Sequence, residues 1–384
     1  MAPIQWQYKP FAPSEDDEEN IDIGSYTPKS RTTRFKKLVF VFIAVCTTLY
    51  LSVRGTQALV RFLSKPCHST HHWHSKVNHT LGGGLPTHFT LPSGDKIPSV
   101  ALGTAGRGEV GLAVKTALEV GYTHVDGAWA YRNEDEVGKA WKASGIPRDQ
   151  IWLTSKLWNF FHAPEDVEAA LDESLSNLGT EYLDLYLIHW PIAFKKGTDN
   201  VVDLELTANP YPTWKKLEEM VDKGKVRNIG ISNFNIARVK NLTANPLKYK
   251  PAVNQVELNF FNPQPELLNW AKENDLLLEA YSPLGSTRQV QESLNQPIVQ
   301  EIAKTLAITP AQVIISWHVQ RGTVVLPKSV TPSRVEENLQ VTALPQDLFE
   351  KLEAAAVSHP PARVVNPSKG WGLDFDIFDD EWPL

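Results

Sequence analysis

The feature that most constrains the fold is a repeated alternation, after Pro86, between short apolar runs and amphipathic stretches with helical spacing. Glu165–Leu178 and Trp214–Lys223 are examples of the helical stretches. Strands that alternate with helices in this way favour a parallel α/β arrangement. The predicted strands are Ser99–Gly103, His124–Asp126, Ile151–Ser155, Leu183–Ile188, Asn228–Ile231, Ala252–Gln255, Leu276–Ala280 and Val324–Leu326.

Eight such strands favour a closed (β/α)8 TIM barrel over residues 87–384. An N-terminal β-hairpin is predicted before it, because HFTL and KIPSV flank a turn at residues 92–95. The alternative is an open dinucleotide-binding sheet, which needs a glycine-rich turn and an acidic residue about 20 residues later. Residues 101–108 are rich in glycine, but that acidic residue is not evident in a dinucleotide-binding context. We therefore predict the barrel.

Three further segments are predicted before the barrel. Residues 1–37 are Pro-rich and polar, which is typical of a disordered tail. Residues 38–60 are predicted to form a single transmembrane helix, because 38–53 carry no charge over 16 residues. A buried or surface-lying apolar helix is the alternative; a cleaved signal peptide does not fit, because 37 residues precede the apolar run. Residues 61–86 are predicted to be a His/Gly-rich linker without a metal site, because the histidine spacing matches no known zinc motif.

The basic residues around the apolar run predict a single-pass topology with the barrel on the lumenal side of an endomembrane. Five basic residues precede the run and three follow it, and basic flanks tend to stay in the cytosol. Because the difference is two residues, a cytosolic barrel stays open as an alternative. Two sequons, at Asn78 and Asn241, are usable acceptors for glycans in a lumen.

Composition excludes some functions. The net charge of −6 gives no basic excess for nucleic acid, so the expected partners are a small molecule and, through residues 38–60, a lipid bilayer. Both cysteines, Cys46 and Cys67, precede the predicted barrel. The barrel therefore has neither a disulfide framework nor a cysteine nucleophile.

Four polar residues close or follow predicted strands, where the active groups of such barrels lie: Asp126, Tyr131, Lys156 and His189. Each alone has a structural interpretation, such as a helix cap or a core histidine. Together they form a proton donor for carbonyl reduction. A tyrosine has an ordinary pKa of about 10, and a lysine cation within about 4–6 Å lowers it by roughly 1–3 units. Asp126 pairs with that ammonium and a neutral His189 orients the substrate oxygen.

Eight ordered stretches of the chain strongly resemble the aldo-keto reductases, and among these the fungal reductases of the xylose reductase and glycerol dehydrogenase kind. The resemblance covers about residues 88–365. The stretches are GDKIPSVALGT, GYTHVDGAWAYRNEDEVG, LTSKLW, YLDLYLIHWP, KVRNIGISNF, AVNQVELN, EAYSPLGS and LPKSVTPSRVEENLQV. The resemblance implies an NADPH-dependent carbonyl reductase in which Tyr131 is the general acid, Lys156 and Asp126 tune it, and His189 orients the substrate.

The resemblance also implies a set of cofactor contacts. The nicotinamide is held by Ser232, Asn233, Gln255 and the stacking Tyr281, and the nearby Gly103, Thr104 and Asp126 belong to the same site. The pyrophosphate meets Ser282, Leu284 and Ser286. The 2′-phosphate of NADPH meets Lys328, Ser329 and Arg334, because a phosphate needs cations and hydroxyl donors, and the adenine end meets Glu337 and Asn338.

The substrate pocket is where the chain departs from the family. Trp158 and Trp190 match aromatic pocket walls, but Ala105 stands where many members have tryptophan, and the following connection is short. We therefore expect a more open pocket. The C-terminal stretch 366–384, with four aromatic residues, resembles the variable tail that folds over the pocket mouth, and barrel cover is the alternative.

Two other functions stay open at this point. Some members of the superfamily are non-catalytic, NADP(H)-binding accessory proteins at a membrane. Alternatively, the barrel oxidises alcohols with NAD, since the direction of reaction depends on the cofactor ratio in the compartment.

Overall fold

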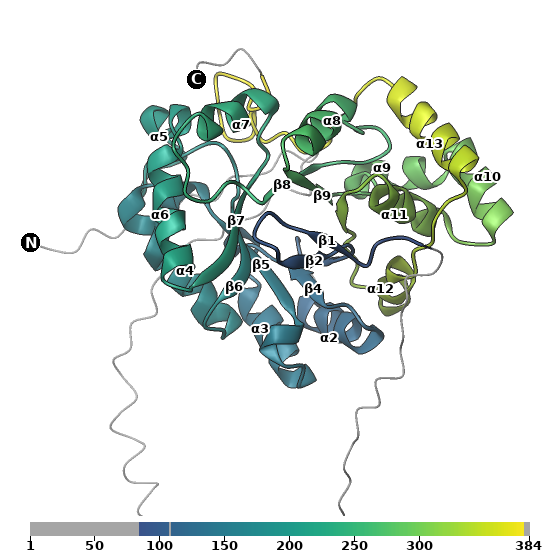
Figure 1. Cartoon of the computed structure of the whole chain (residues 1–384), viewed down its shortest axis with the longest axis horizontal. Coiled ribbons are helices and arrows are strands. Elements are labelled where there is room, and N and C mark those ends of the chain that lie inside the picture. The colour runs from purple at the N-terminus through teal and green to yellow at the C-terminus, as the bar shows by residue number, and fades with distance from the viewer. Residues whose placement is uncertain (1–83, 107–108, 380–384) are drawn as a thin grey trace, which may run out of the picture. The chain divides into compact units, whose positions relative to one another are not determined.

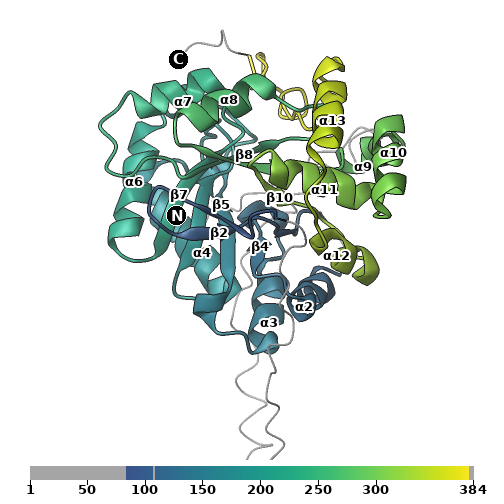
Figure 2. The same ribbon diagram turned by 45° about the vertical axis from the view of Figure 1, so that its right-hand side comes forward.

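A computed structural model describes residues 84–106 and 109–379 of the chain. Within them a parallel sheet forms the centre of the molecule, and helices surround it (Figures 1 and 2). The strands of this sheet are β3 (Leu102–Gly103), β4 (His124–Asp126), β5 (Trp152–Leu157), β6 (Leu183–Ile188), β7 (Val226–Ser232), β8 (Val253–Glu257), β9 (Leu277–Tyr281) and β10 (Val324–Leu326).

The strands follow one another around the sheet in the order of the sequence, from β3 to β10, and every neighbouring pair is parallel. The sheet also closes on itself. Val100, just before β3, pairs in parallel with Val325 of β10, and the Ala101 N–H donates to the Val325 carbonyl at 2.9 Å. The prediction of a closed (β/α)8 barrel is therefore confirmed, and the open-sheet alternative is excluded.

The predicted hairpin covers the N-terminal end of the barrel. Strands β1 (His88–Thr90) and β2 (Lys96–Pro98) pair antiparallel. The turn between them reaches the start of β7, where Asp95 forms an ion pair with Arg227 at 2.6 Å and Ser93 donates to Asn228. The residues that we expect to bind substrate and cofactor lie at the opposite, C-terminal end of the strands.

The helices pack on the outside of the barrel because their apolar faces meet the outward side chains of the strands. The described helices of eight or more residues are α2 (Val110–Val120), α3 (Glu134–Ser144), α4 (Pro164–Leu178), α6 (Tyr211–Asp222), α7 (Ile236–Thr243), α8 (Pro265–Glu273), α9 (Ser286–Leu294), α10 (Pro297–Leu306), α11 (Pro310–Gln320), α12 (Pro332–Leu339) and α13 (Gln346–Ser358). The remaining pieces are α5 (Leu204–Ala208) and the 3-10 turns η1 (Trp129–Tyr131), η2 (Arg148–Gln150) and η3 (Asn159–Phe161).

Side chains alternate between the two faces of each strand. In β5, Leu153 and Leu157 belong to the outer core, whereas Trp152 packs with the barrel interior and Lys156 reaches Asp126 inside it. In β9, Leu278 belongs to the same outer core as Leu153. The polar residues of the site therefore occupy the inner face, at the C-terminal end of the strands.

The structure shifts several predicted boundaries. Strand β5 extends to Leu157, so Lys156 lies inside the strand rather than after it, because it pairs with Leu187 of β6. The first barrel strand is shorter than predicted, since only 102–103 form the ladder with β4. Leu85, which was assigned to the linker, is buried against the core.

The predictions for residues 1–83 lie outside the described residues. They include the tail, the transmembrane helix at 38–60, most of the linker with its histidines, both cysteines and Asn78. Within residues 84–106 and 109–379, no single helix is long and apolar enough to cross a bilayer. Helices α10 and α11 meet those criteria only as a pair that is bent by 95°.

Candidate active site

An ion pair lies at the centre of the barrel mouth. The Lys156 Nζ donates to the Asp126 Oδ1 at 2.7 Å and to the Gly127 carbonyl at 2.8 Å. Lys156 is 0% exposed and Asp126 is 3% exposed. A buried charge without a partner is strongly destabilising, so each of these two residues requires the other in the folded state.

Tyr131 and His189 lie beside this pair. The Lys156 Nζ is 5.2 Å from the centre of the Tyr131 ring. The rings of Tyr131 and His189 meet edge to face with centres 5.8 Å apart. The structure therefore brings together all four residues that the sequence singled out as catalytic candidates.

Electrostatics fix the charge state of two of these residues. Burial lowers the pKa of Lys156, but Asp126 and Tyr131 outweigh it and the net pKa is raised, so the ammonium stays charged. The pKa of His189 lies well below its ordinary value, first because of burial and then because of the Lys156 charge. His189 is therefore a neutral imidazole with one N–H donor and one acceptor nitrogen.

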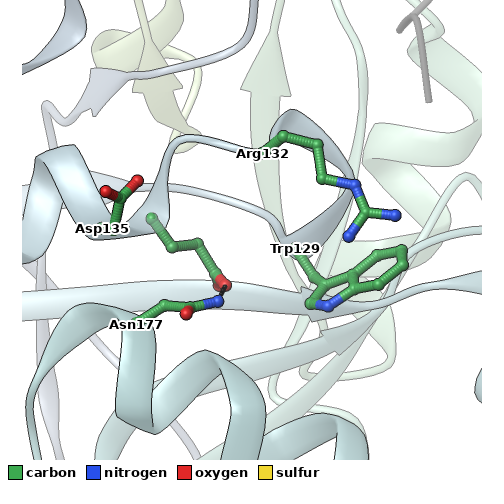
Figure 3. A pocket seen from close by; sticks show the side chains of 5 residues that line it. Trp129, Arg132, Asp135 and Asn177 are labelled. Atoms are coloured by element: carbon green, nitrogen blue, oxygen red, sulfur yellow. Dashed lines mark hydrogen bonds between the residues drawn. The ribbon is translucent and has the colours of Figure 1, made fainter. Parts of the chain in front are cut away.

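The turn that carries Tyr131 is held firmly on both sides. Tyr131 ends the turn η1. Trp129 at the start of this turn stacks with Arg132 just after it, and the Arg132 guanidinium lies 3.4 Å from the centre of the Trp129 ring. Figure 3 shows these two side chains at the edge of a hollow, whose volume is about 200 Å³. Glu134 lines the same hollow and accepts from Ser155 at 2.6 Å, which ties the start of α3 to β5. These contacts fix the backbone on either side of the phenol.

The residues expected to hold the nicotinamide form one connected group at the ends of β7, β8 and β9. The Ser232 Oγ donates to the Gln255 carbonyl at 2.8 Å, and the Asn233 Nδ2 donates to the His189 carbonyl at 2.9 Å. The Tyr281 hydroxyl donates to the Asn233 Oδ1 at 2.8 Å. Asn233 has φ 65°, a left-handed conformation that asparagine tolerates better than most residues.

The loop expected to meet the pyrophosphate follows β9 and leads into α9. Ser282 and Ser286 both have positive φ, at 48° and 55°. The Ser286 Oγ is buried and has no hydrogen-bond partner among the described residues. Leu284 packs against the core. An orphaned hydroxyl at the N-terminus of a nine-residue helix fits an anionic group, because the free backbone N–H groups there favour negative charge.

Of the residues expected at the 2′-phosphate, the two cations are exposed and Ser329 is half-buried. Neither Lys328 nor Arg334 forms an ion pair with another residue in the described ranges, and both side chains are exposed. Ser329 accepts from the Thr331 N–H at 3.1 Å. Two exposed cations within six positions of the Ser329 hydroxyl in the sequence fit a phosphate of nearly two negative charges.

The other expected cofactor residues are more deeply tied into the fold. Gly103 and Thr104 start the first loop of the mouth, and the Thr104 Oγ1 donates to the Asp126 carbonyl at 2.9 Å. A Cβ on Gly103 would lie 3.1 Å from the Leu326 carbonyl, so glycine suits this close approach. Glu337 accepts from the Thr309 hydroxyl at 2.5 Å, which leaves its second carboxylate oxygen for a ligand. Asn338 is 5% exposed.

Aromatic residues enclose the space beside His189. Trp158 lies 5.2 Å from His189 between ring centres, and Trp190 stacks on the same imidazole at 6.3 Å. Trp371 of the C-terminal segment contacts both indoles, at 5.9 and 5.2 Å. The segment therefore lies against the pocket walls that the sequence indicated. Ala105 is exposed, whereas residues 107–108 of the shortened connection and Trp382 lie outside the described residues.

Sequence reasoning missed two buried carboxyl groups. Glu257, at the end of β8, accepts from the N–H groups of Val364 and Val365 at 2.9 and 2.7 Å, and so anchors the C-terminal segment. Glu279 in β9 is 0% exposed and accepts from Gln255. For Glu279, a charged residue within the otherwise apolar strand β9 was the available signal, since charged side chains are almost never fully buried without a partner.

The comparisons with known proteins agree with this geometry. The model of the Aldo/keto reductase family matches residues 103–357. A glycerol 2-dehydrogenase (NADP(+)) of Hypocrea jecorina is 40% identical over 76% of this chain and 98% of its own, and one of Saccharomyces cerevisiae is 42% identical over 76% and 96%. The solved aldose reductase of Schistosoma japonicum superposes with a TM-score of 0.70 at 38% identity, over 77% of this chain and 99% of its own.

The chain belongs to the aldo/keto reductase family, and it is therefore an oxidoreductase. The family assignment made from the sequence motifs is confirmed.

Proposed function

We propose that this enzyme reduces the aldehyde or ketone group of a small molecule to an alcohol, with Tyr131 as the general acid. The observation that carries the proposal is the buried ammonium of Lys156, paired with Asp126 at 2.7 Å and lying 5.2 Å from the centre of the Tyr131 ring. Relatives that are named as NADP(+)-dependent glycerol 2-dehydrogenases support the same chemistry at an alcohol or carbonyl carbon.

The cofactor is NADP(H). Bound NADPH supplies the hydride that converts the carbonyl carbon to an alkoxide carbon. The exposed cations Lys328 and Arg334 and the orphaned Ser286 hydroxyl are the residues that suit its phosphates. Ser232, Asn233 and Gln255 suit its carboxamide, since they offer amide and hydroxyl groups at the mouth of the barrel.

Tyr131 holds its proton until the alkoxide forms and then donates it to the substrate oxygen. Loss of that proton leaves a tyrosinate, and the Lys156 cation stabilises this anion. Asp126 keeps the ammonium in place, because its carboxylate accepts at 2.7 Å where water is excluded. Proton transfer from a positioned side chain contributes about 10²- to 10⁴-fold to a rate.

His189 orients the carbonyl. Because its imidazole is neutral, it donates a single N–H bond without competing with Tyr131 as an acid. The surrounding Trp158, Trp190 and Trp371 rings exclude water and present an apolar wall to the rest of the substrate. Exclusion of water strengthens the electrostatic effect of Lys156 on the phenol.

The test of this function is consumption of NADPH by the full chain with a series of aldehydes, ketones and sugars. We expect turnover with at least one carbonyl class, and stoichiometric appearance of the alcohol. Tight NADPH binding without turnover of any substrate would instead favour the accessory, non-catalytic role.

We also propose that residues 38–60 tether the barrel to a bilayer, with the barrel on the lumenal side. The support is the uncharged run of 16 residues and the greater number of basic residues before it. Full-length protein in membranes should resist carbonate extraction. Release by carbonate would contradict the tether.

Glycosidase treatment tests the orientation. Asn241 lies within α7, where its Nδ2 donates to the Ala208 carbonyl at 2.8 Å, so a glycan there would replace an existing hydrogen bond. We therefore expect a mobility shift that Asn78→Gln abolishes and Asn241→Gln preserves. Absence of any shift in the wild type would contradict a lumenal barrel.

A further inference from the structure

Glu279 is a buried carboxyl group that the proposed mechanism does not use. It lies in β9 on the inner face of the barrel, and the ladder pairs it directly with Gln255 of β8. Paired residues of neighbouring strands point to the same side, so the two side chains project into the interior together. Both are essentially inaccessible to water, with 0% and 1% exposed.

The Gln255 amide nitrogen joins two carboxyl groups. It donates one hydrogen to the Asp126 Oδ2 and the other to the Glu279 Oε2, each at 2.8 Å. A primary amide nitrogen carries only two hydrogens, so both are used. If the amide were flipped, its carbonyl oxygen would face two carboxyl oxygens. The orientation with the carbonyl oxygen turned away from both carboxyl groups is therefore favoured.

Asp126 alone does not fix this orientation of the Gln255 amide. With one carboxyl acceptor, the second N–H of the amide is unsatisfied inside a buried site, and an unpaired buried donor is unfavourable. Glu279 supplies the second acceptor. Its other oxygen, Oε1, has no hydrogen-bond partner among the described residues.

We propose that Glu279 is a positioning residue that, together with Asp126, holds the Gln255 amide with its carbonyl oxygen presented to the carboxamide N–H₂ of the nicotinamide. This inference rests on the proposed function, because it requires NADP(H) at the mouth of the barrel. In this arrangement the Gln255 carbonyl oxygen accepts a hydrogen bond from the carboxamide, and Glu279 fixes the orientation of the Gln255 amide.

Ionisation of Glu279 should make the relative affinity for NADP⁺ and NADPH depend on pH. Burial and then the Asp126 carboxylate raise its pKa to about 8, whereas the hydrogen bond from Gln255 and then the Lys156 cation act in the opposite direction. The carboxyl group is therefore neutral at pH 7 and becomes ionised as the pH rises above about 8. An added negative charge favours the oxidised cofactor, whose ring is cationic, over NADPH, whose ring is neutral.

The test measures dissociation constants of NADP⁺ and NADPH from pH 6.5 to about 9.5 for the full chain and two variants. Glu279→Leu removes the acceptor, and we expect affinity for both cofactors to fall about tenfold, as for one lost buried hydrogen bond. Glu279→Gln retains an acceptor oxygen but cannot ionise. It should bind both cofactors within about twofold of wild type at pH 7, and it should lose the several-fold rise in relative NADP⁺ affinity above pH 8.

Leu278→Ala is the matched control, since this neighbour in β9 packs in the outer core and not in the barrel interior. It should lower thermal stability and leave both dissociation constants unchanged. Wild-type affinity in Glu279→Leu, or equal losses in Glu279→Leu and Glu279→Gln, would overturn the proposal. If Glu279→Leu does not fold, Glu279→Gln decides alone, because retention of the wild-type pH dependence would overturn it.

The outcome is distinguishable from failure of the proposed function. If wild-type protein neither binds NADPH nor consumes it with a carbonyl substrate, the proposed function fails. If wild-type protein does both and only the Glu279 variants behave unexpectedly, the positioning role alone fails.

Discussion

The two ends of the proposed cofactor site treat charge in opposite ways. At the proton-donor end, Lys156 is fully buried and its charge is neutralised by Asp126 at 2.7 Å. At the phosphate end, Lys328 and Arg334 are exposed and form no ion pair with any residue in the described parts of the chain. A buried charge requires a counter-ion within the protein. An exposed cation is solvated by water and therefore needs no counter-ion before a ligand binds. We therefore expect the first region to contribute to the stability of the fold and the second to contribute to cofactor affinity alone.

The sharpest way to test this contrast is to remove one charge at each end and measure stability. Lys156→Met leaves Asp126 buried without a counter-ion, and we expect it to lower the free energy of unfolding by about 3–5 kcal/mol in urea titrations. Arg334→Ala, as the matched change at the exposed end, should alter it by less than about 0.5 kcal/mol. Similar small losses in both variants would break the contrast.

Cofactor affinity, unlike stability, should be affected by the loss of the exposed charge. Arg334→Ala removes a charged donor to the 2′-phosphate, and we expect NADPH binding to weaken about 10- to 100-fold while NADH binding stays within about twofold. Fluorescence titration of the two cofactors measures this. Lys351→Ala, an exposed cation on α13, is the control and should change neither. Equal losses for both cofactors in Arg334→Ala would remove the assignment of Arg334 to the phosphate.

A change in salt concentration should also distinguish the two ends of the proposed cofactor site, and we expect this effect to be the smallest. Exposed charges are screened over about 10 Å at 0.1 M salt, whereas buried pairs are screened much less. We therefore expect the NADPH dissociation constant to rise several-fold between about 0.05 and 0.5 M salt. Turnover at saturating cofactor should change by less than about twofold. A comparable loss of turnover under saturation would show that the buried pair is accessible to ions.

The strand pattern predicted the barrel because parallel strands alternate with helices in sequence order. His124–Asp126, Leu183–Ile188 and Val324–Leu326 match the structure at both ends. The candidate catalytic residues could be found because the ends of parallel strands meet at one mouth, so residues distant in sequence become neighbours. The length of the first barrel strand was harder to predict, because β3 is shorter than the apolar run that contains it.

Contacts between segments that are distant in the sequence could not be predicted. Glu257 accepts from Val364 and Val365, which follow it by more than 100 positions, and no local pattern marks that meeting. The same holds for Gln255, whose amide lies between carboxyl groups of β4 and β9. Strand periodicity tells which residues face the interior. It does not tell which of them share a hydrogen bond.

The central claim is that Tyr131 delivers the proton and that the buried ammonium beside it makes this possible. The most direct measurement is single-turnover oxidation of bound NADPH by Tyr131→Phe and by wild-type protein with the same carbonyl substrate, with cofactor binding measured in parallel. We predict that the rate in Tyr131→Phe falls by about 10²-fold or more, and that the NADPH dissociation constant stays within about twofold of wild type. A near-normal rate in Tyr131→Phe would contradict the account.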